Sequence, residues 1–167
     1  MEENILLVGF MGSGKSVVGK ELSKILNRDF IDTDTEIEKE ENRSIKDIFN
    51  NDGEEYFRNL ESKLLETLVN KNNCIISTGG GIVLRENNRE LLKKIGKVIF
   101  LHADVEHILN NVKNDDTRPL LQTEDYAAKV SEMLESREDK YLSSADIIIQ
   151  TSGKGVESIA EEIITLL

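Results

Sequence analysis

The sequence is poor in several features that would restrict its location or chemistry. It has one cysteine, Cys74, so an internal disulfide is excluded, and the apolar run around it indicates a small buried core residue. No hydrophobic run approaches the ~20 residues that a membrane-spanning helix needs. The first four residues include two glutamates and no basic residue, and they precede only a short apolar run, which is not the pattern of a signal peptide. We therefore expect a cytoplasmic protein.

Positive charge is also scarce. The chain has 21 lysine and arginine residues against 32 aspartate and glutamate residues, a formal net charge of −11. Nucleic acids and anionic membranes are bound by basic faces, so neither is expected as a partner. An anionic small-molecule substrate would need a local cluster of arginine and lysine to overcome the field of the whole protein.

What the sequence does have is an alternation of short apolar runs with longer helical patterns. Its 167 residues fit one domain, 1–167, with a substantial core. Four of the five runs are almost continuously apolar, which is typical of parallel strands covered on both faces. The acidic stretch 34–42 indicates a weaker surface helix. We therefore predict an α/β fold with a five-stranded parallel sheet flanked by helices on both faces. The strands are expected at residues 4–9, 29–32, 74–78, 97–102 and 146–150.

One proline, Pro119, lies in the stretch 113–125, which fits neither a helix nor a strand. The stretch is polar and separates two helical patterns. In a compact domain such a segment is often a mobile lid over an active site, and we expect a lid at about 112–125. A plain surface connection is the alternative.

Residues 9–16 match the phosphate-binding pattern G-x-x-x-x-G-K-[ST] between a predicted strand and a predicted helix. The glycines let the backbone turn tightly so that N–H groups point at phosphate oxygens, and the helix N-terminus adds partial positive charge. Lys15 can reach the β- and γ-phosphates, and Ser16 can ligate Mg²⁺. The expected ATP-binding residues of this loop are Gly12, Ser13, Gly14, Lys15, Ser16 and Val17.

Two carboxylates follow the second predicted strand. Asp32 and Asp34 lie at i and i+2, and in an extended segment this spacing projects both to the same side. Ligands of parallel α/β sheets bind beyond the carboxyl ends of the strands, so both carboxylates should face the phosphate site. One can hold the metal or its water, while the other accepts a hydrogen bond from an attacking hydroxyl. The alternative is that Asp32 caps the next helix.

Other segments carry charge or backbone freedom. Arg58 and Glu61 lie three apart on one helical face, and this stretch alone favours a solvated surface pair. Residues 77–81 end in three glycines after the third strand, which permits a ligand to approach the backbone closely. Two further arginines lie beyond, in "TRPLL" and "REDKY": Arg118 and Arg137.

Taken in order, the motifs "GFMGSGKS", "DTD", "FRNLE", "TGGG", "RPLL" and "REDKY" resemble those of shikimate kinases. The resemblance extends from residue 4 to about residue 165. The phosphate loop is shared by many families, whereas the ordered set of acceptor motifs is not. The resemblance implies a P-loop kinase fold and transfer of the ATP γ-phosphate to the 3-hydroxyl of shikimate, in chorismate and aromatic amino-acid biosynthesis.

The resemblance also implies roles for individual residues. Asp34 would hold the acceptor hydroxyls, and the acceptor would bind within a helical region at about 33–61. Two arginines would clamp the carboxylate, because guanidinium groups suit planar bidentate recognition. The implied substrate-binding residues are Asp34, Arg58, Gly79, Gly80, Gly81 and Arg137.

On the nucleotide side, the resemblance implies that Lys15, Asp34 and Arg118 form the catalytic set, with Arg118 reaching the phosphates from the lid. Mg²⁺, the implied cofactor, would lie near Ser16 and Asp32. Phosphoryl transfer needs cations around the equatorial oxygens more than it needs a strong base. Closure of the lid would exclude water, which otherwise competes as acceptor.

The chain departs from the family at one point. Family members often have an arginine that stacks on adenine several residues before the lid arginine, where this chain has Asn110 and Asn111. Adenine would then be held differently, for example by the loop 151–155. His102 and His107 have no metal-ligand partners at suitable spacing, and we interpret both as structural.

Two rival functions fit parts of the pattern. A gluconate kinase of the same fold would also phosphorylate a polyhydroxylated carboxylate, but the ordered acceptor motifs favour shikimate. A nucleotide-binding regulator without activity would not need Asp34 and Arg118. The lack of an obvious exposed apolar stripe suggests a monomer.

Overall fold

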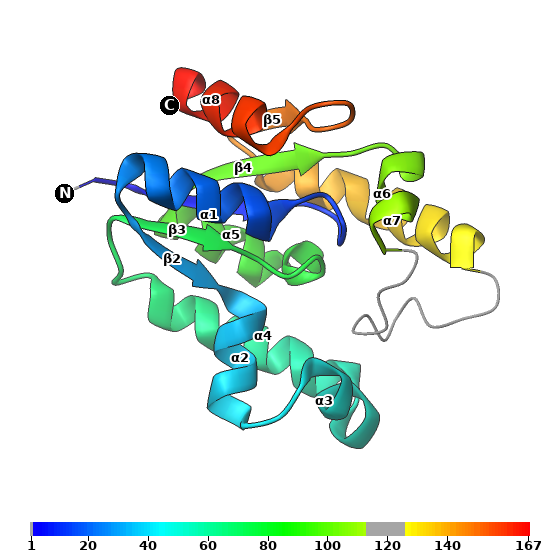
Figure 1. The fold of residues 1–167 in the computed structure, drawn as a ribbon. Coiled ribbons are helices and arrows are strands. Elements are labelled where there is room, and N and C mark those ends of the chain that lie inside the picture. Colours follow the sequence, from blue (N-terminus) through cyan, green and yellow to red (C-terminus); the bar gives the residue numbers. More distant parts are fainter. Residues whose placement is uncertain (1, 113–125) are drawn as a thin grey trace.

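The computed structural model describes residues 2–112 and 126–167, and its centre is one parallel sheet (Figure 1). The strands pair in the order β2-β3-β1-β4-β5, all parallel. Each strand begins and ends within one residue of its predicted bounds, so the predicted five-stranded parallel sheet is confirmed. The strands are β1 (Asn4–Val8), β2 (Asp29–Asp32), β3 (Cys74–Ser77), β4 (Gly96–His102) and β5 (Ile147–Gln150).

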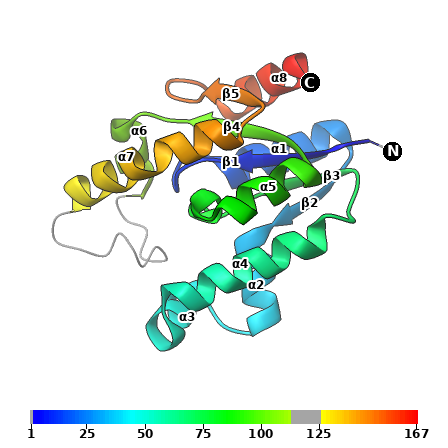
Figure 2. The ribbon, with the colours of Figure 1, turned by 180° about the vertical axis from the view of Figure 1, so that it is seen from behind.

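Helices cover both faces of this sheet (Figures 1 and 2). α1 (Lys15–Leu26) and α8 (Val156–Leu166) pack on one face, whereas α4 (Glu54–Leu68), α5 (Glu86–Ile95) and α7 (Tyr126–Ser144) pack on the other. The middle positions of the central strands are apolar because successive side chains enter two different cores. In β1, Ile5 and Leu7 pack toward α1 and α8, while Leu6 and Val8 pack toward the opposite helices.

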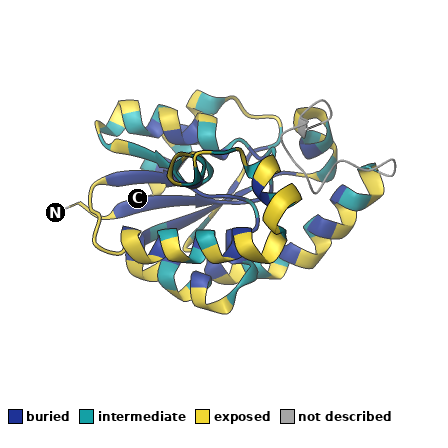
Figure 3. Ribbon diagram, turned by 90° about the horizontal axis from the view of Figure 1, so that it is seen from below, coloured by how far each residue is buried: buried dark blue, intermediate teal, exposed yellow. Residues whose placement is uncertain are grey.

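Burial follows this layering (Figure 3). The three inner strands are almost wholly buried, whereas β2 and β5 form the two edges and keep exposed or half-buried positions. Cys74 is buried, as its sequence context predicts. Among the described residues, no helix combines the length and apolar character needed to cross a membrane.

A smaller helical unit extends from the edge of the sheet next to β2. α2 (Thr33–Glu41), α3 (Ile45–Asp52) and the first half of α4 enclose a separate apolar cluster of Ile37, Ile48 and Phe57. The helix predicted at 34–42 is therefore present, but Ile37 anchors it to a core. These three helices span most of the region 33–61 that we expect to bind the acceptor.

Two short elements complete the described chain. The 3-10 turn η1 (Ile82–Leu84) follows the glycine segment after β3, and α6 (Val105–Val112) follows β4. The expected lid at about 112–125, with Arg118, lies outside the described residues apart from its first position.

Candidate active site

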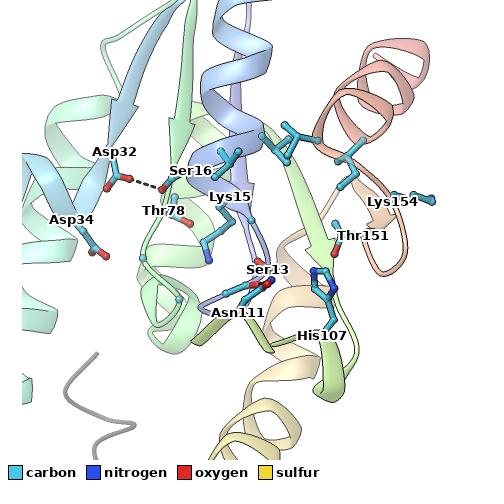
Figure 4. A pocket seen from close by; sticks show the side chains of 18 residues that line it. Ser13, Lys15, Ser16, Asp32, Asp34, Thr78, His107, Asn111, Thr151 and Lys154 are labelled. Carbon is cyan, nitrogen blue, oxygen red and sulfur yellow. Dashed lines mark hydrogen bonds between the residues drawn. The ribbon is translucent and has the colours of Figure 1, made fainter. Parts of the chain in front are cut away.

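A cavity of about 480 Å³ opens where the strands end (Figure 4). Its walls come from the segments that follow all five strands, both loops and the first turns of helices, which is where ligands bind in parallel α/β sheets. One end of the cavity is lined by Asp34 and by Gly79 and Gly80. The other end is lined by α6 and the loop that precedes α8. The phosphate loop lies between these two ends.

The phosphate loop forms a tight turn into α1. Gly12 and Gly14 have φ angles of 80° and 93°, a region that residues with a Cβ rarely adopt. The Ser13 N–H donates to the Phe10 carbonyl at 3.1 Å and closes the turn. All six residues predicted from Gly12 to Val17 line the cavity.

Lys15 is the buried cation of this loop, with 8% of its surface exposed. Its Nζ donates to the Gly9 carbonyl at 2.8 Å and to the Phe10 carbonyl at 2.9 Å. These bonds hold the ammonium group beside the helix N-terminus. The arrangement suits a phosphate, because the lysine charge and the partial charge of the helix act at the same point.

Ser16 and Asp32 are in direct contact. The Ser16 hydroxyl donates to Asp32 Oδ2 at 2.7 Å (Figure 4) and lies 3.3 Å from Ser77 Oγ. The other carboxylate oxygen, Asp32 Oδ1, accepts from the Thr35 N–H at 3.2 Å and caps α2. The sequence left open whether Asp32 caps the next helix or lies beside the phosphate loop. In the structure its carboxylate does both.

Asp34 lines the cavity, but the prediction that it lies in an extended segment is wrong. The chain becomes helical at Thr33, so Asp34 lies in the first turn of α2 and not in an extended segment. A carboxylate is favoured in that turn by the helix dipole. Asp32 and Asp34 nevertheless both line the cavity, because α2 starts at its edge.

Arg58 and Glu61 form a buried ion pair and not a solvated one. Arg58 Nη1 donates to Glu61 Oε1 at 2.6 Å, and the two side chains are 8% and 0% exposed. A second bond, from Arg58 Nη2 to Glu54 Oε1, is 3.1 Å long. The pair is buried because this face of α4 packs under the glycine segment that follows β3, a contact that the local sequence cannot reveal.

Glycines 79–81 lie against these charges. A Cβ on Gly79 would lie 2.8 Å from Asp34 Oδ1 and 2.9 Å from Glu61 Oε2, and a Cβ on Gly80 would lie 3.6 Å from Arg137 Nη1. The buried Tyr141 hydroxyl donates to the Gly80 carbonyl at 2.5 Å. The structure thus brings Asp34, Arg58, the glycines and Arg137 together. Of this group, Asp34, Gly79 and Gly80 line the cavity itself.

Several buried polar atoms of this group lack a hydrogen-bond partner among the described residues. They are Arg58 Nε, Glu61 Oε2 and Arg137 Nη1. Buried polar groups are normally satisfied, so an unsatisfied cluster indicates a ligand-binding site. Two of the three atoms are guanidinium donors, which suit an anionic oxygen ligand.

The pKa of Glu61 gives a testable dependence of stability on pH. Burial raises this pKa from 4.5 to about 7, against the opposing charge of Arg58. Between these values the folded protein binds more protons than the unfolded chain, so the contribution of Glu61 to stability falls as pH rises and is constant above about pH 7. Relative to Glu61→Gln, the free energy of unfolding of the wild type should fall by up to about 3 kcal/mol between pH 5 and pH 8.

Urea unfolding at both pH values measures this difference. Glu66→Gln, on the exposed face of the same helix, is the matched control and should show no such change. A difference between wild type and Glu61→Gln that rises with pH, or stays constant, would contradict the raised pKa.

Gly81→Ala tests the close packing of the glycine segment. The backbone of Gly81 is ordinary, with a φ angle of −95°, but an added Cβ would overlap the Arg58 guanidinium. We expect a loss of about 1–3 kcal/mol in the free energy of unfolding and a displaced Arg58. Gly155→Ala is the control, since a Cβ there meets open space. Equal stability of the two variants in urea would show that Gly81 tolerates a side chain.

Nothing in the sequence indicates that His107 lies at the cavity. His107, on α6, lines the cavity together with Asn111 one turn later, and Thr151 and Lys154 line it from the loop before α8 (Figure 4). Residue spacing does not predict that these side chains meet, because α6 and the loop before α8 lie about 40 residues apart in the sequence. His102 does not line the cavity, and its ring lies between Gln150 and Glu138.

A lysine-bearing glycine loop at a helix N-terminus, facing carboxylates across one cavity with buried arginines beside its glycine wall, defines a P-loop kinase with a small-molecule acceptor. A gluconokinase from Sinorhizobium meliloti has this fold, with a TM-score of 0.60 at 14% identity over 98% of this chain and 90% of that one. The family model described as shikimate kinase matches residues 11–167. The chain belongs to the shikimate kinase family, whose members are ATP-dependent kinases.

Individual relatives agree with this family. The chain is 45% identical to a shikimate kinase of Sulfurihydrogenibium sp. over 98% of its own length and 96% of the relative's. It is 45% identical to that of Persephonella marina, with 96% of each chain covered. A solved shikimate kinase from Acinetobacter baumannii, in complex with shikimate, superposes with a TM-score of 0.97 at 37% identity, covering 99% of this chain and 93% of that one.

Proposed function

We propose that this protein transfers the γ-phosphate of ATP to the 3-hydroxyl of shikimate, giving shikimate 3-phosphate and ADP. The observation that carries the proposal is a pair of buried guanidinium nitrogens, Arg58 Nε and Arg137 Nη1, that have no hydrogen-bond partner among the described residues. Both arginines lie beside the glycine segment that, with Asp34, lines one end of the cavity, next to the phosphate loop. Such donors suit a carboxylate, while Asp34 suits the hydroxyls of the same molecule. The solved relative in complex with shikimate, at 37% identity, supports the same acceptor.

In the proposed mechanism, Lys15 binds the β- and γ-phosphates and stabilises the charge that develops on their oxygens. Asp34 accepts a hydrogen bond from the 3-hydroxyl and orients it for in-line attack. Arg58 and Arg137 fix the shikimate carboxylate, so that the hydroxyl lies within reach of the γ-phosphate. Arg118 belongs to the proposed lid and would add a further cation to the transferred group.

Mg²⁺ is the proposed cofactor. The contact of 2.7 Å between Ser16 and Asp32 brings together the two oxygen ligands that would hold it, directly or through water. When bound, the ion neutralises charge on the phosphate oxygens. Across residues 2–112 and 126–167 no group of three or more histidine, cysteine or acidic side chains could hold a metal.

Four further expectations complete the proposal. The chain is a single domain, its acceptor site lies in the region 33–61, and it acts as a monomer in the cytoplasm. Each rests on the sequence interpretation and on the family, and each has its own measurement, such as sedimentation for the monomer.

A coupled assay of ADP release tests the function, with shikimate, gluconate or no acceptor. We expect turnover that depends on shikimate, with little release from gluconate. Release that depends on gluconate would support the rival sugar-acid kinase. Binding of ATP without release under any of the three conditions would support a regulator.

The two arginines should differ when replaced. Arg58→Ala leaves Glu61 buried without its partner, so it should lower the free energy of unfolding by about 3–5 kcal/mol as well as weaken shikimate binding. Arg137 forms no ion pair with a described residue, so Arg137→Ala should keep the fold and raise the Kd for shikimate by roughly 10–100-fold. Calorimetric titration of shikimate and urea unfolding measure both. An unchanged Kd in Arg137→Ala would remove this residue from the site.

A further inference from the structure

The direction of the nucleotide in the cavity follows from the positions of the two reacting groups. In-line transfer requires the attacking and leaving oxygens to lie on opposite sides of the γ-phosphate. Asp34 marks the acceptor side and Lys15 marks the phosphates, so the nucleoside extends away from Asp34. The cavity continues in that direction between α6 and residues 151–156 (Figure 4). This inference rests on the proposed function for its direction.

The two walls at that end are tied to each other. The Thr151 N–H donates to the His102 carbonyl at 2.9 Å, and the Asp104 N–H donates to Ser152 Oγ at 3.1 Å. Asp104 Oδ1 in turn accepts from the His107 N–H at 3.1 Å, which caps the start of α6. The first turn of α6 is therefore held against the loop before α8, and His107 has a fixed position beside the cavity.

Most polar side chains at this end are already engaged. Asn111 Nδ2 donates to the Gly12 carbonyl at 2.7 Å, so the asparagine is tied to the phosphate loop. Thr151 Oγ1 donates to the His102 carbonyl at 3.1 Å, and Lys154 Nζ bonds Glu162 Oε2 at 2.7 Å. These contacts hold the three side chains in place in the wall of the cavity.

His107 differs from these neighbours. It is half-buried, and its imidazole forms no hydrogen bond with any residue that the structure describes. Among the described residues that line the cavity, it is the one with an aromatic ring. Val156 and Ile159 add apolar surface to the lining of the same cavity. A planar ring and apolar side chains in one cavity are the chemistry that binds a nucleobase, because every base has a π-face.

We propose that His107 is a base-binding residue of the nucleotide site, with its imidazole stacked on the purine of ATP. Asn111, one turn later on the same helix, has its amide bonded to the phosphate loop, so the imidazole of His107 is the planar group that α6 offers to the base. His107 thus sets affinity for the nucleoside and leaves the phosphate and acceptor contacts unchanged.

The test is calorimetric titration of two probes, ADP and inorganic pyrophosphate, into the full-length protein. Loss of a stacked aromatic side chain weakens base binding roughly tenfold, so His107→Ala should raise the Kd for ADP by about that factor. His107→Phe, which keeps an aromatic face without ring nitrogens, should stay within about threefold of wild type. Pyrophosphate has no base, and its Kd should not change in either variant.

Asn110→Ala is the matched control, because Asn110 is an exposed residue of the same helix that does not line the cavity. Its Kd for ADP should equal that of the wild type. An unchanged Kd for ADP in His107→Ala would overturn the proposal, as would an equal weakening of pyrophosphate. Loss in His107→Phe as large as in His107→Ala would overturn stacking. These titrations need no acceptor, so they remain informative if shikimate is not phosphorylated.

Discussion

Replacing Lys15 with methionine is expected to lower kcat for phosphate transfer by at least about 10²–10³-fold, the usual effect of removing one preorganised charge from a transition state. The side chain is buried in the phosphate loop, with its ammonium group bonded to the Gly9 and Phe10 carbonyls. Methionine has a similar length and no charge, so the loop keeps its packing. Steady-state assays at saturating ATP and shikimate measure the effect.

Lys20→Met is the control, since Lys20 is an exposed lysine on the same helix. It should keep wild-type activity, and circular dichroism should show that both variants are folded. A folded Lys15→Met protein with unchanged kcat would contradict the assignment of residues 9–16 as the catalytic phosphate loop.

Replacement of Asp34 separates two roles of its carboxylate. A loose, metaphosphate-like transition state asks little of a base, because the attacking hydroxyl loses its proton late. We therefore expect orientation to be the larger role. Asp34→Asn keeps one acceptor oxygen and should lose about 10–10²-fold in kcat, whereas Asp34→Ala should lose roughly 10³-fold.

Asp47→Ala is the control for the fold. Asp47 lies in the first turn of α3, as Asp34 lies in the first turn of α2, but it is exposed and does not line the cavity. It should therefore remain active. Complete and equal loss in folded Asn and Ala variants of Asp34 would identify an obligatory base. Wild-type activity in both would remove Asp34 from the site.

The sheet could be predicted from the sequence because its inner strands are buried on both faces. Ile5 and Leu7 enter one core and Leu6 and Val8 the other, so the run is apolar throughout and stands out from the helical patterns. The phosphate loop was equally visible, since its glycines and Lys15 are adjacent in sequence. Local patterns were sufficient for both features.

Contacts between distant segments were not visible in the same way. The sequence around Arg58 is typical of a solvent-exposed helix face. Its charges are buried because this face packs under residues 79–81, which are distant in sequence. The i and i+2 spacing of Asp32 and Asp34 predicts an extended segment, but a helix begins one residue before Asp34. His107 carried no signal, because the loop that faces it follows a strand about 40 residues later.

The most direct test of the account is the identity of the phosphorylated carbon. The product of ATP and shikimate can be examined by proton–phosphorus correlation, in which an ester phosphorus couples to the hydrogen on its own carbon. We predict that, besides the two signals of ADP, one new phosphorus signal appears, coupled to the hydrogen at carbon 3 and equal in amount to the ADP formed. Coupling to the hydrogen at carbon 4 or 5, or inorganic phosphate as the only new signal, would contradict it.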